Sequence, residues 1–175
     1  MMDDDTRLPP EMVFDEGFFG RESVKAVCYP IRAIGPRDPG DESILVKWQE
    51  LEYKICDYSK RFQSRFSTVL YPHGAVSLWE RETLINCLRD HDTVFYGDDV
   101  KMGLWLQHHN YKMIMDHRYL IDTESHITWS GLYEQRGEYT QSFRGMYNMG
   151  NTHPTSLIVL TLILQSEVGT WQSMY

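Results

Sequence analysis

The chain has 175 residues, 42% of them hydrophobic, and a formal net charge of −8 at pH 7. It is long enough for one domain with a buried core, while the negative charge and the lack of a Lys/Arg cluster argue against a surface that binds nucleic acid. An odd number of cysteines without a CxxC spacing indicates neither a disulfide framework nor a zinc site and favours a reducing compartment; they are Cys28, Cys56 and Cys87. The acidic start has no apolar h-region, so no signal peptide is expected.

The first half of the chain alternates helical and extended patterns. A short helix is predicted over residues 9–19, begun by prolines, and a strand over residues 24–34, which contain several β-branched side chains. Residues 35–43 are rich in Gly, Pro and Asp and predict an exposed loop. Residues 44–66 contain no Gly or Pro and predict an amphipathic helix packed against the sheet. Its apolar positions are Leu45, Trp48, Leu51, Ile55, Tyr58 and Phe62.

The second half continues the α/β pattern. Residues 67–79 predict a strand that enters a glycine turn, and residues 80–91 predict a helix with acidic residues at its start. Residues 93–111 place two aspartates between a short apolar run and another helix. Residues 112–125 have a strand-like pattern, and residues 129–150 have a helical pattern with glycine breaks.

The most apolar stretch runs from Leu157 to Leu164. It is much shorter than the roughly 20 residues that a membrane-spanning helix needs. We therefore expect a buried strand or a core helix segment there rather than a membrane span.

The chain opens with three consecutive aspartates, Asp3, Asp4 and Asp5, for which two interpretations stand. A run of charge at a chain end is commonly a solvated surface. Alternate carboxylates on an extended segment can also bind one Mg²⁺ or Mn²⁺ ion, because these cations prefer oxygen ligands.

The order of short motifs along the chain carries a family resemblance. "DDDT" is followed by "WQELEY", "HGAVSLW", "GDD", "TES" and "EQRGEY". This order resembles the processive, membrane-associated family 2 glycosyltransferases, which include chitin, hyaluronan and cellulose synthases. The resemblance runs from about Asp3 to about Arg144. It implies an α/β fold, namely part of a Rossmann-like GT-A domain with a mixed sheet and flanking helices.

The resemblance also implies a domain organisation. In the family, roughly the first half of the catalytic domain precedes the aspartate motif at which this chain begins. Residues 1–150 are therefore expected to be the C-terminal half of the catalytic domain. Residues 151–175 are expected to be a tail that includes a remnant of a membrane-associated segment.

The resemblance assigns a divalent cation, Mg²⁺ or Mn²⁺, to the start of the chain. Asp3 and Asp5 match the family's DxD motif, and Thr6 with the following Leu8 and Pro9 resembles its usual continuation. A metal held there would neutralise the charge that develops on the leaving diphosphate of a sugar nucleotide.

Two further motifs match residues near the reacting groups. Asp98 and Asp99 match the family's base motif, in which the last aspartate, here Asp99, takes a proton from the acceptor hydroxyl. Asp98 is expected beside the substrate, and a helix N-cap is the alternative role for an aspartate in this position. Gly74 and Ala75 match a small-residue turn that passes close to the donor sugar. The adjacent His73 is more simply explained as a structural residue.

The remaining motif is the family's QxxRW. Gln135 and Arg136 match its start and are expected to bind the substrate, whereas Glu138 and Tyr139 stand where the family has Arg and Trp. Tyr139 retains a ring on which a sugar could stack. Glu124 in "TES" is expected to be structural rather than catalytic.

Together these matches predict an inverting, metal-dependent glycosyltransferase. The expected partners are a nucleotide-sugar donor, UDP-linked by resemblance, and a polysaccharide or oligosaccharide acceptor. The alternatives are a non-catalytic remnant that acts as a binding module, and a soluble, non-processive glycosyltransferase. The resemblance places the full-length protein at a membrane with its catalytic domain in the cytosol, and we expect little or no transferase activity from the isolated chain.

Overall fold

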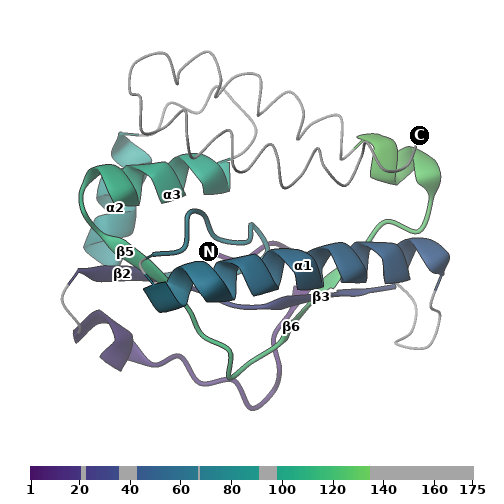
Figure 1. Cartoon of the computed structure of the whole chain (residues 1–175), viewed down its shortest axis with the longest axis horizontal. Helices are drawn as coiled ribbons and strands as arrows, with labels where there is room; N and C mark the ends of the chain where they lie inside the picture. Colours follow the sequence, from purple (N-terminus) through teal and green to yellow (C-terminus); the bar gives the residue numbers. More distant parts are fainter. Residues whose placement is uncertain (21–22, 36–42, 67, 91–97, 135–175) are drawn as a thin grey trace.

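The computed structural model describes residues 1–20, 23–35, 43–66, 68–90 and 98–134. Within these ranges the chain forms strands, helices and one short 3-10 helix (Figure 1). In chain order they are β1 (Thr6–Arg7), η1 (Glu16–Gly20), β2 (Val24–Cys28), β3 (Ile31–Ile34), α1 (Ile44–Phe66), β4 (Ser77–Trp79), α2 (Arg81–Arg89), α3 (Asp98–His108), β5 (Lys112–Met115) and β6 (Ile121–Glu124).

The strands form two three-stranded mixed sheets with the orders β4-β2-β5 and β1-β6-β3. β2 pairs in parallel with β5, and β3 pairs in parallel with β6, while β4 and β1 are antiparallel to their neighbours. One chain segment contains β2 and β3, and a second contains β5 and β6. The two segments pair in parallel, first in one sheet and then in the other. The fold agrees with the predicted α/β class.

Proline interrupts what the sequence predicts as one strand over residues 24–34. β2 ends at Cys28 and β3 begins at Ile31, because Pro30 between them has no N–H to donate to a neighbouring strand. The carbonyl oxygen of Pro30 still accepts a hydrogen bond from the Ile121 N–H at 3.0 Å. The partner segment is divided in the same way, into β5 and β6.

β2 forms the centre of the core because both of its faces are buried. Ala26 and Cys28 pack into a cluster with residues of α2 and α3, whereas Val27 contributes to a second cluster on the other face. A strand buried on both sides is typical of sheets covered by helices or loops on both faces.

The predicted helix over residues 9–19 is largely absent. Residues 10 and 11 form a turn, and only Glu16–Gly20 forms a single stretch of 3-10 helix. The Asp15 side chain accepts a hydrogen bond from the Gly17 N–H at 2.9 Å, which is a local alternative to a continuous helix.

The helices of the middle of the chain are confirmed. α1 has the predicted bounds, α2 lies within the predicted residues 80–91, and α3 begins at the two aspartates. Residues 129–134 are also helical, in agreement with the start of the predicted helix over residues 129–150. The rest of that helix and residues 151–175, with the apolar run Leu157–Leu164, lie outside the described residues.

The orientation of α1 differs from the prediction. Leu45 is buried, but most of the predicted apolar face points away from the sheet. We call this set of exposed hydrophobic residues the outer stripe: Ile44, Trp48, Leu51, Ile55, Tyr58 and Phe62. The side of α1 that packs on the sheet instead contains Val46 and polar residues, which include the fully buried Gln49. Figure 1 shows α1 lying along β3, and α1 packs against β3 and β5.

Glycine allows α3 to pack closely against the segment that leads to the predicted donor turn. A Cβ atom at Gly103 would lie 2.0 Å from the Leu70 carbonyl oxygen and 2.8 Å from the Tyr71 Cα atom. Gln107, one turn further along α3, donates a hydrogen bond to the same Leu70 oxygen at 3.1 Å. None of the helices within the described ranges is both long enough and apolar enough to cross a membrane.

Candidate active site

The structure brings the acidic start of the chain against the predicted donor turn. The Asp3 N–H donates to the Ala75 carbonyl oxygen at 3.0 Å, and the Thr6 hydroxyl donates to the same oxygen at 3.2 Å. A Cβ atom at Gly74 would lie 3.7 Å from Asp3 Oδ2. The missing side chain of Gly74 therefore leaves space beside the Asp3 carboxylate.

The three aspartates concentrate negative charge at this place. Loss of hydration and then the charges of Asp5 and Asp4 raise the pKa of Asp3 above its ordinary value, while the N-terminal ammonium group opposes the shift. A bound cation would relieve this repulsion. Asp5 Oδ1 also accepts a hydrogen bond from the Thr123 hydroxyl at 3.4 Å, which connects Asp5 to β6.

The carboxylates of Asp3 and Asp5 suit a cation that takes its other ligands from a substrate. Within the described part of the chain, no group of three or more His, Cys, Asp or Glu side chains is placed to hold a metal ion. Asp3 and Asp5 offer two carboxylates, and Mg²⁺ in nucleotide sites is commonly bound by one or two carboxylates together with substrate phosphates and water. These residues therefore suit a metal that binds with the diphosphate of a donor.

The predicted base lies at the first turn of α3. Asp99 is partly buried, and its Oδ1 atom accepts a hydrogen bond from the Val100 N–H at 2.9 Å. Burial raises the pKa of Asp99, and the positive charge of Lys60 opposes the shift. A carboxylate with a raised pKa is a stronger proton acceptor than an ordinary one. Asp98 is exposed at the start of the same helix.

A buried polar network links α1 to the predicted donor turn. His73, directly before Gly74, donates from Nε2 to Asp57 Oδ1 at 2.7 Å. Lys60 Nζ donates to His73 Nδ1 at 3.0 Å. Asp57 Oδ2 in turn accepts a hydrogen bond from the Ile31 N–H at 3.3 Å. We call Asp57, Lys60 and His73 the inner network. It holds the donor turn against α1.

The charge states of this network follow from burial. Burial, with the nearby Lys60 charge, lowers the pKa of His73 to about 4, so the imidazole is neutral at pH 7. Burial also lowers the pKa of Lys60, whose Nζ atom lies 4.5 Å from the centre of the Tyr71 ring. The charges of Asp99 and Asp57 act on Lys60 in the opposite direction. Lys60 is thus electrostatically coupled both to the predicted base and to the other two members of the inner network.

Asp57 and Lys60 belong to none of the sequence motifs, and His73 was expected to be structural only. A signal was present in the helix, because Gln49, Tyr53, Asp57 and Lys60 recur at intervals of four, four and three residues and so lie on one face.

Gln49 anchors the other end of α1. Its side-chain amide donates to the His126 carbonyl oxygen at 2.8 Å, just after β6, and to the Leu45 oxygen at 3.1 Å. These hydrogen bonds join the first turns of α1 to the end of β6, so we assign Gln49 a structural role. Glu124 forms an ion pair with Arg7, which agrees with a structural role.

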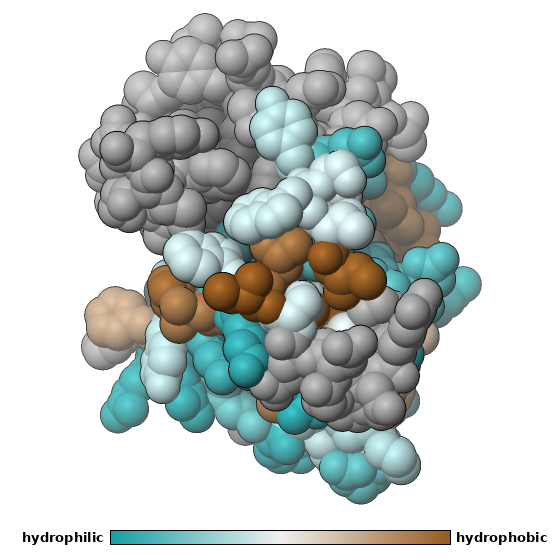
Figure 2. All heavy atoms as spheres, turned by 90° about the vertical axis from the view of Figure 1, so that its right-hand side faces the viewer, coloured by the Kyte–Doolittle hydropathy of each residue, from teal (hydrophilic) through white to brown (hydrophobic). Residues whose placement is uncertain are grey.

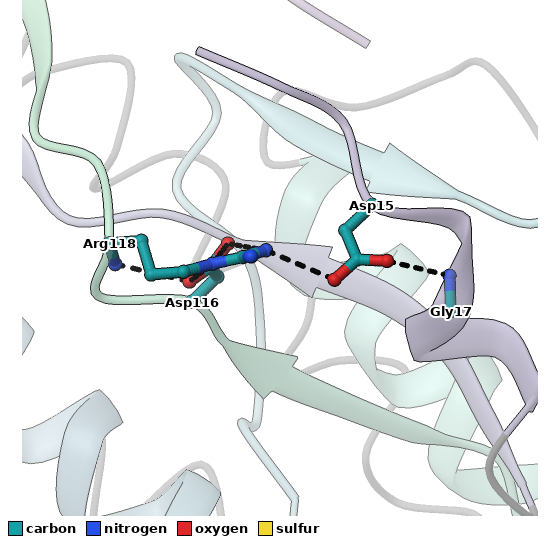
Figure 3. A network of polar contacts seen from close by, with 4 residues as sticks. All are labelled: Asp15, Gly17, Asp116 and Arg118. Carbon is teal, nitrogen blue, oxygen red and sulfur yellow. Dashed lines mark hydrogen bonds and ion pairs between the residues drawn. The ribbon is translucent and has the colours of Figure 1, made fainter. Parts of the chain in front are cut away.

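A second polar network supports the fold away from these residues (Figure 3). Arg118 donates from Nε and Nη2 to the two carboxylate oxygens of Asp116, both at 3.0 Å, and its Nη2 lies 3.4 Å from Asp15 Oδ2. Asp15 also binds the Gly17 N–H. The network joins the start of η1 to the connection between β5 and β6, so we assign it a structural role.

The predicted substrate residues of the QxxRW-like motif are not part of the described geometry. Gln135, Arg136 and Tyr139, together with Glu138, lie outside the described residues. Of the remaining predicted residues, Asp3 is brought together with Gly74 and Ala75, and Asp5 lies beside Thr123. Asp99 is related to this group through the charge of Lys60 rather than through a direct hydrogen bond among the described residues.

Comparison with known proteins identifies one family. A family model described as "Glycosyl transferase family group 2" matches residues 1–172. No curated protein matches the chain. The match confirms the resemblance at the level of the family, and with it the expectation of a partial GT-A fold with a mixed sheet and flanking helices.

Proposed function

Because the chain belongs to glycosyl transferase family group 2, we propose that it carries the C-terminal half of a GT-A catalytic domain that transfers a sugar from a UDP-linked donor to a polysaccharide or oligosaccharide acceptor. The observation that carries the proposal is the placement of the Asp3 carboxylate against the open side of Gly74. A carboxylate and a turn without side-chain bulk are what a metal-bound sugar diphosphate needs in one place.

Asp3 and Asp5 would hold a divalent cation, Mg²⁺ or Mn²⁺. The cation would stabilise the negative charge that develops on the leaving diphosphate. The hydrogen bonds from the Asp3 N–H and the Thr6 hydroxyl to Ala75 fix the acidic segment and the turn relative to each other. The chain's own contribution is therefore to orient the two carboxylates.

Asp99 would act as the general base. It would accept the proton of an acceptor hydroxyl as the hydroxyl oxygen attacks the anomeric carbon on the face opposite the diphosphate, which inverts the configuration. Its raised pKa supports this role, because a base works best when its pKa approaches the working pH. The Lys60 charge opposes the rise in the pKa of Asp99 that burial causes.

The residues of the last motif complete the proposal. Gln135 and Arg136 would bind the diphosphate or the acceptor, Tyr139 would stack on a sugar, and Asp98 would lie beside the substrate. Association of the full-length protein with a membrane, with the catalytic domain in the cytosol, is part of the same proposal.

The second candidate is a binding module without catalysis. It is favoured by Glu138, which stands where an arginine is expected and would repel a diphosphate. A soluble, non-processive transferase would explain the replacement of the tryptophan by Tyr139. Binding and turnover must therefore be measured separately.

The first experiment measures binding of Mn²⁺ and UDP to the 175-residue chain by electron paramagnetic resonance of the metal. We expect UDP to strengthen Mn²⁺ binding, and we expect Asp3→Asn and Asp5→Asn to weaken Mn²⁺ binding by at least about tenfold, or about 1.4 kcal/mol. Asp4→Asn is the matched control, because it removes the same charge from the residue between them. Equal losses for all three variants would show that only the overall charge matters and would refute the assignment of the two ligands.

The second experiment measures UDP release from UDP-sugars by the longest available form of the protein. Asp99→Asn should abolish turnover while leaving Mn²⁺ and UDP binding unchanged. If UDP and Mn²⁺ bind but neither the native chain nor any variant releases UDP, the non-catalytic binding module is the better description.

A further inference from the structure

The outer stripe of α1 is an interaction surface that the proposed transfer reaction does not use. Its six large hydrophobic side chains are between 50% and 77% exposed. Single exposed hydrophobic residues are common on proteins, but a continuous row of six along one helix is not. Figure 2 looks onto the end of the molecule at which α1 begins and shows hydrophobic side chains gathered at the surface.

The spacing of the stripe indicates the shape of its partner. Its residues, numbers 44, 48, 51, 55, 58 and 62, are separated alternately by four and three positions. This is the 3.5-residue period of a coiled-coil seam, in which two positions per heptad contact another helix. A helix that lies on a membrane surface presents a broader apolar face. The narrow seam therefore favours a second helix.

The residues beside the stripe favour a second copy of α1 in parallel orientation. One flank carries Lys47, Lys54 and Arg61. In an antiparallel pair these cations would face the same flank of the other copy and repel it. In a parallel pair, Lys47 of one copy lies opposite Glu52 of the other.

The seam residues agree with the parallel arrangement. In heptad terms, Ile55 occupies an a position and Leu51 a d position. A β-branched residue at a with leucine at d favours parallel two-stranded coiled coils. Aromatic side chains at other seam positions add hydrophobic area.

The area is sufficient for a reversible dimer. If each of the six side chains exposes about 100 Å², the stripe offers about 600 Å² per copy, compared with about 800 Å² in an average stable complex. We therefore expect a dimer that dissociates on dilution.

We propose that two copies of this chain associate through the outer stripes of their α1 helices, packed in parallel with Ile55 against Ile55. The inner network lies on the opposite side of α1, so the association leaves the candidate active site uncovered. The inference stands independently of the transferase chemistry.

The test uses the full 175-residue chain and measures its mass by sedimentation equilibrium over a range of concentrations. The native chain should approach twice the monomer mass as concentration rises. Ile55→Glu and Ile55→Lys should each be monomeric, because like charges would meet across the parallel seam. An equimolar mixture of the two variants should again form a dimer, because the opposite charges would then face each other.

Leu88→Glu on α2 is the matched control. Leu88 is 52% exposed and Ile55 is 53% exposed, but Leu88 lies outside the stripe, so its variant should dimerise like the native chain. Far-UV circular dichroism and urea unfolding check that all variants fold equally well.

Three outcomes would overturn the proposal. The native chain could remain monomeric at every concentration, or the single Ile55 variants could dimerise like the native chain. The third is a monomeric chain that binds vesicles of phosphatidylserine and phosphatidylcholine and loses this binding in Ile55→Glu, which would assign the stripe to a lipid surface.

Discussion

The two faces of α1 reverse the usual arrangement of an amphipathic helix. The inner face buries Asp57 and Lys60 in hydrogen bonds with His73, whereas the outer face exposes the hydrophobic stripe. A buried polar group is tolerated when it is hydrogen-bonded. Here the shared partner is His73, which lies directly before the predicted donor turn. The face of this helix that is buried is therefore the one that forms hydrogen bonds with His73, and not the one that hydrophobic periodicity predicts.

The largest expected effect comes from a substitution on α3 that disturbs the inner face of α1. Gly103→Ala would place a Cβ atom 2.0 Å from the Leu70 oxygen and force the Leu70–Tyr71 backbone, and with it the ring above Lys60, to move. We expect a loss of more than about 3 kcal/mol in the free energy of unfolding, measured by urea denaturation.

Gly20→Ala provides the control for this substitution. Nothing lies within 4 Å of a Cβ atom built there, so its effect should stay within about 0.5 kcal/mol. A Gly103→Ala protein as stable as the native one would mean that α3 is free to move away from Leu70 and Tyr71.

The pH dependence of stability tests whether the inner face is as buried as described. The pKa of His73 is about 4 in the fold and 6.5 in the unfolded chain, so between these values the unfolded chain binds more protons. This contribution to stability is therefore present above pH 6.5 and is lost as the pH falls toward 4, by about 3 kcal/mol in all.

The measurement compares urea unfolding of the native chain and of His73→Gln at several pH values from 4 to 7. The variant should lose most of the slope, and the remainder should include a contribution from His117, whose pKa is also lowered by burial. Identical slopes for both proteins would place His73 in contact with solvent.

Removing the carboxylate of the inner network should have the next largest effect. Asp57→Ala leaves the His73 Nε2–H and the Ile31 N–H without their acceptor, so we expect a loss of about 2 kcal/mol in the free energy of unfolding. Glu50→Ala on the same helix breaks the exposed ion pair with Lys54 and should cost about 0.5 kcal/mol or less. Equal losses would remove the distinction between the two faces.

The smallest expected effect comes from a substitution on the outer stripe, and it compares the two faces of α1 directly. Leu51→Ala on the outer stripe should change the stability of the monomer by no more than about 0.5 kcal/mol, whereas Val46→Ala, at a position only 4% exposed, should cost about 1.5 kcal/mol. Thermal or urea unfolding must be followed at a concentration where the chain is monomeric. A larger loss for Leu51→Ala would mean that the stripe is covered within one chain.

Much of the fold could be predicted from local sequence patterns. The absence of Gly and Pro fixed the bounds of α1, and the aspartate pair marked the start of α3. The break at Pro30 could have been predicted from the missing N–H, although the β-branched run suggested one strand. The short helix over residues 9–19 was wrong because Asp15 offers the backbone a local hydrogen bond in place of a helical one.

The sequence motifs named the candidate site residues, but they did not include the residues of α1 that support the site. The resemblance assigned Asp3 to a metal and Gly74 to the turn beside the donor sugar, but it predicted no contact between the two residues. Lys60 and Asp57 belong to no motif, and their role depends on a tertiary contact with His73 across more than ten residues of sequence. The orientation of α1 could not be predicted because a row of apolar residues does not state whether a sheet or another molecule covers it.

The pairing of the first strand with the last described strand sets the order in which the site can form during synthesis. Thr6 in β1 pairs with Thr123 in β6, and the Asp5 carbonyl oxygen accepts a hydrogen bond from the Glu124 N–H at 3.2 Å. A ribosome adds roughly 5 to 20 residues per second, so the acidic segment leaves the tunnel many seconds before its partner strand. Asp3 can pair with Ala75 as soon as the turn at Gly74 has emerged, whereas Asp5 gains its hydrogen bond from Thr123 only when β6 follows. A nascent chain stalled before residue 121 should therefore not yet have assembled the proposed metal site.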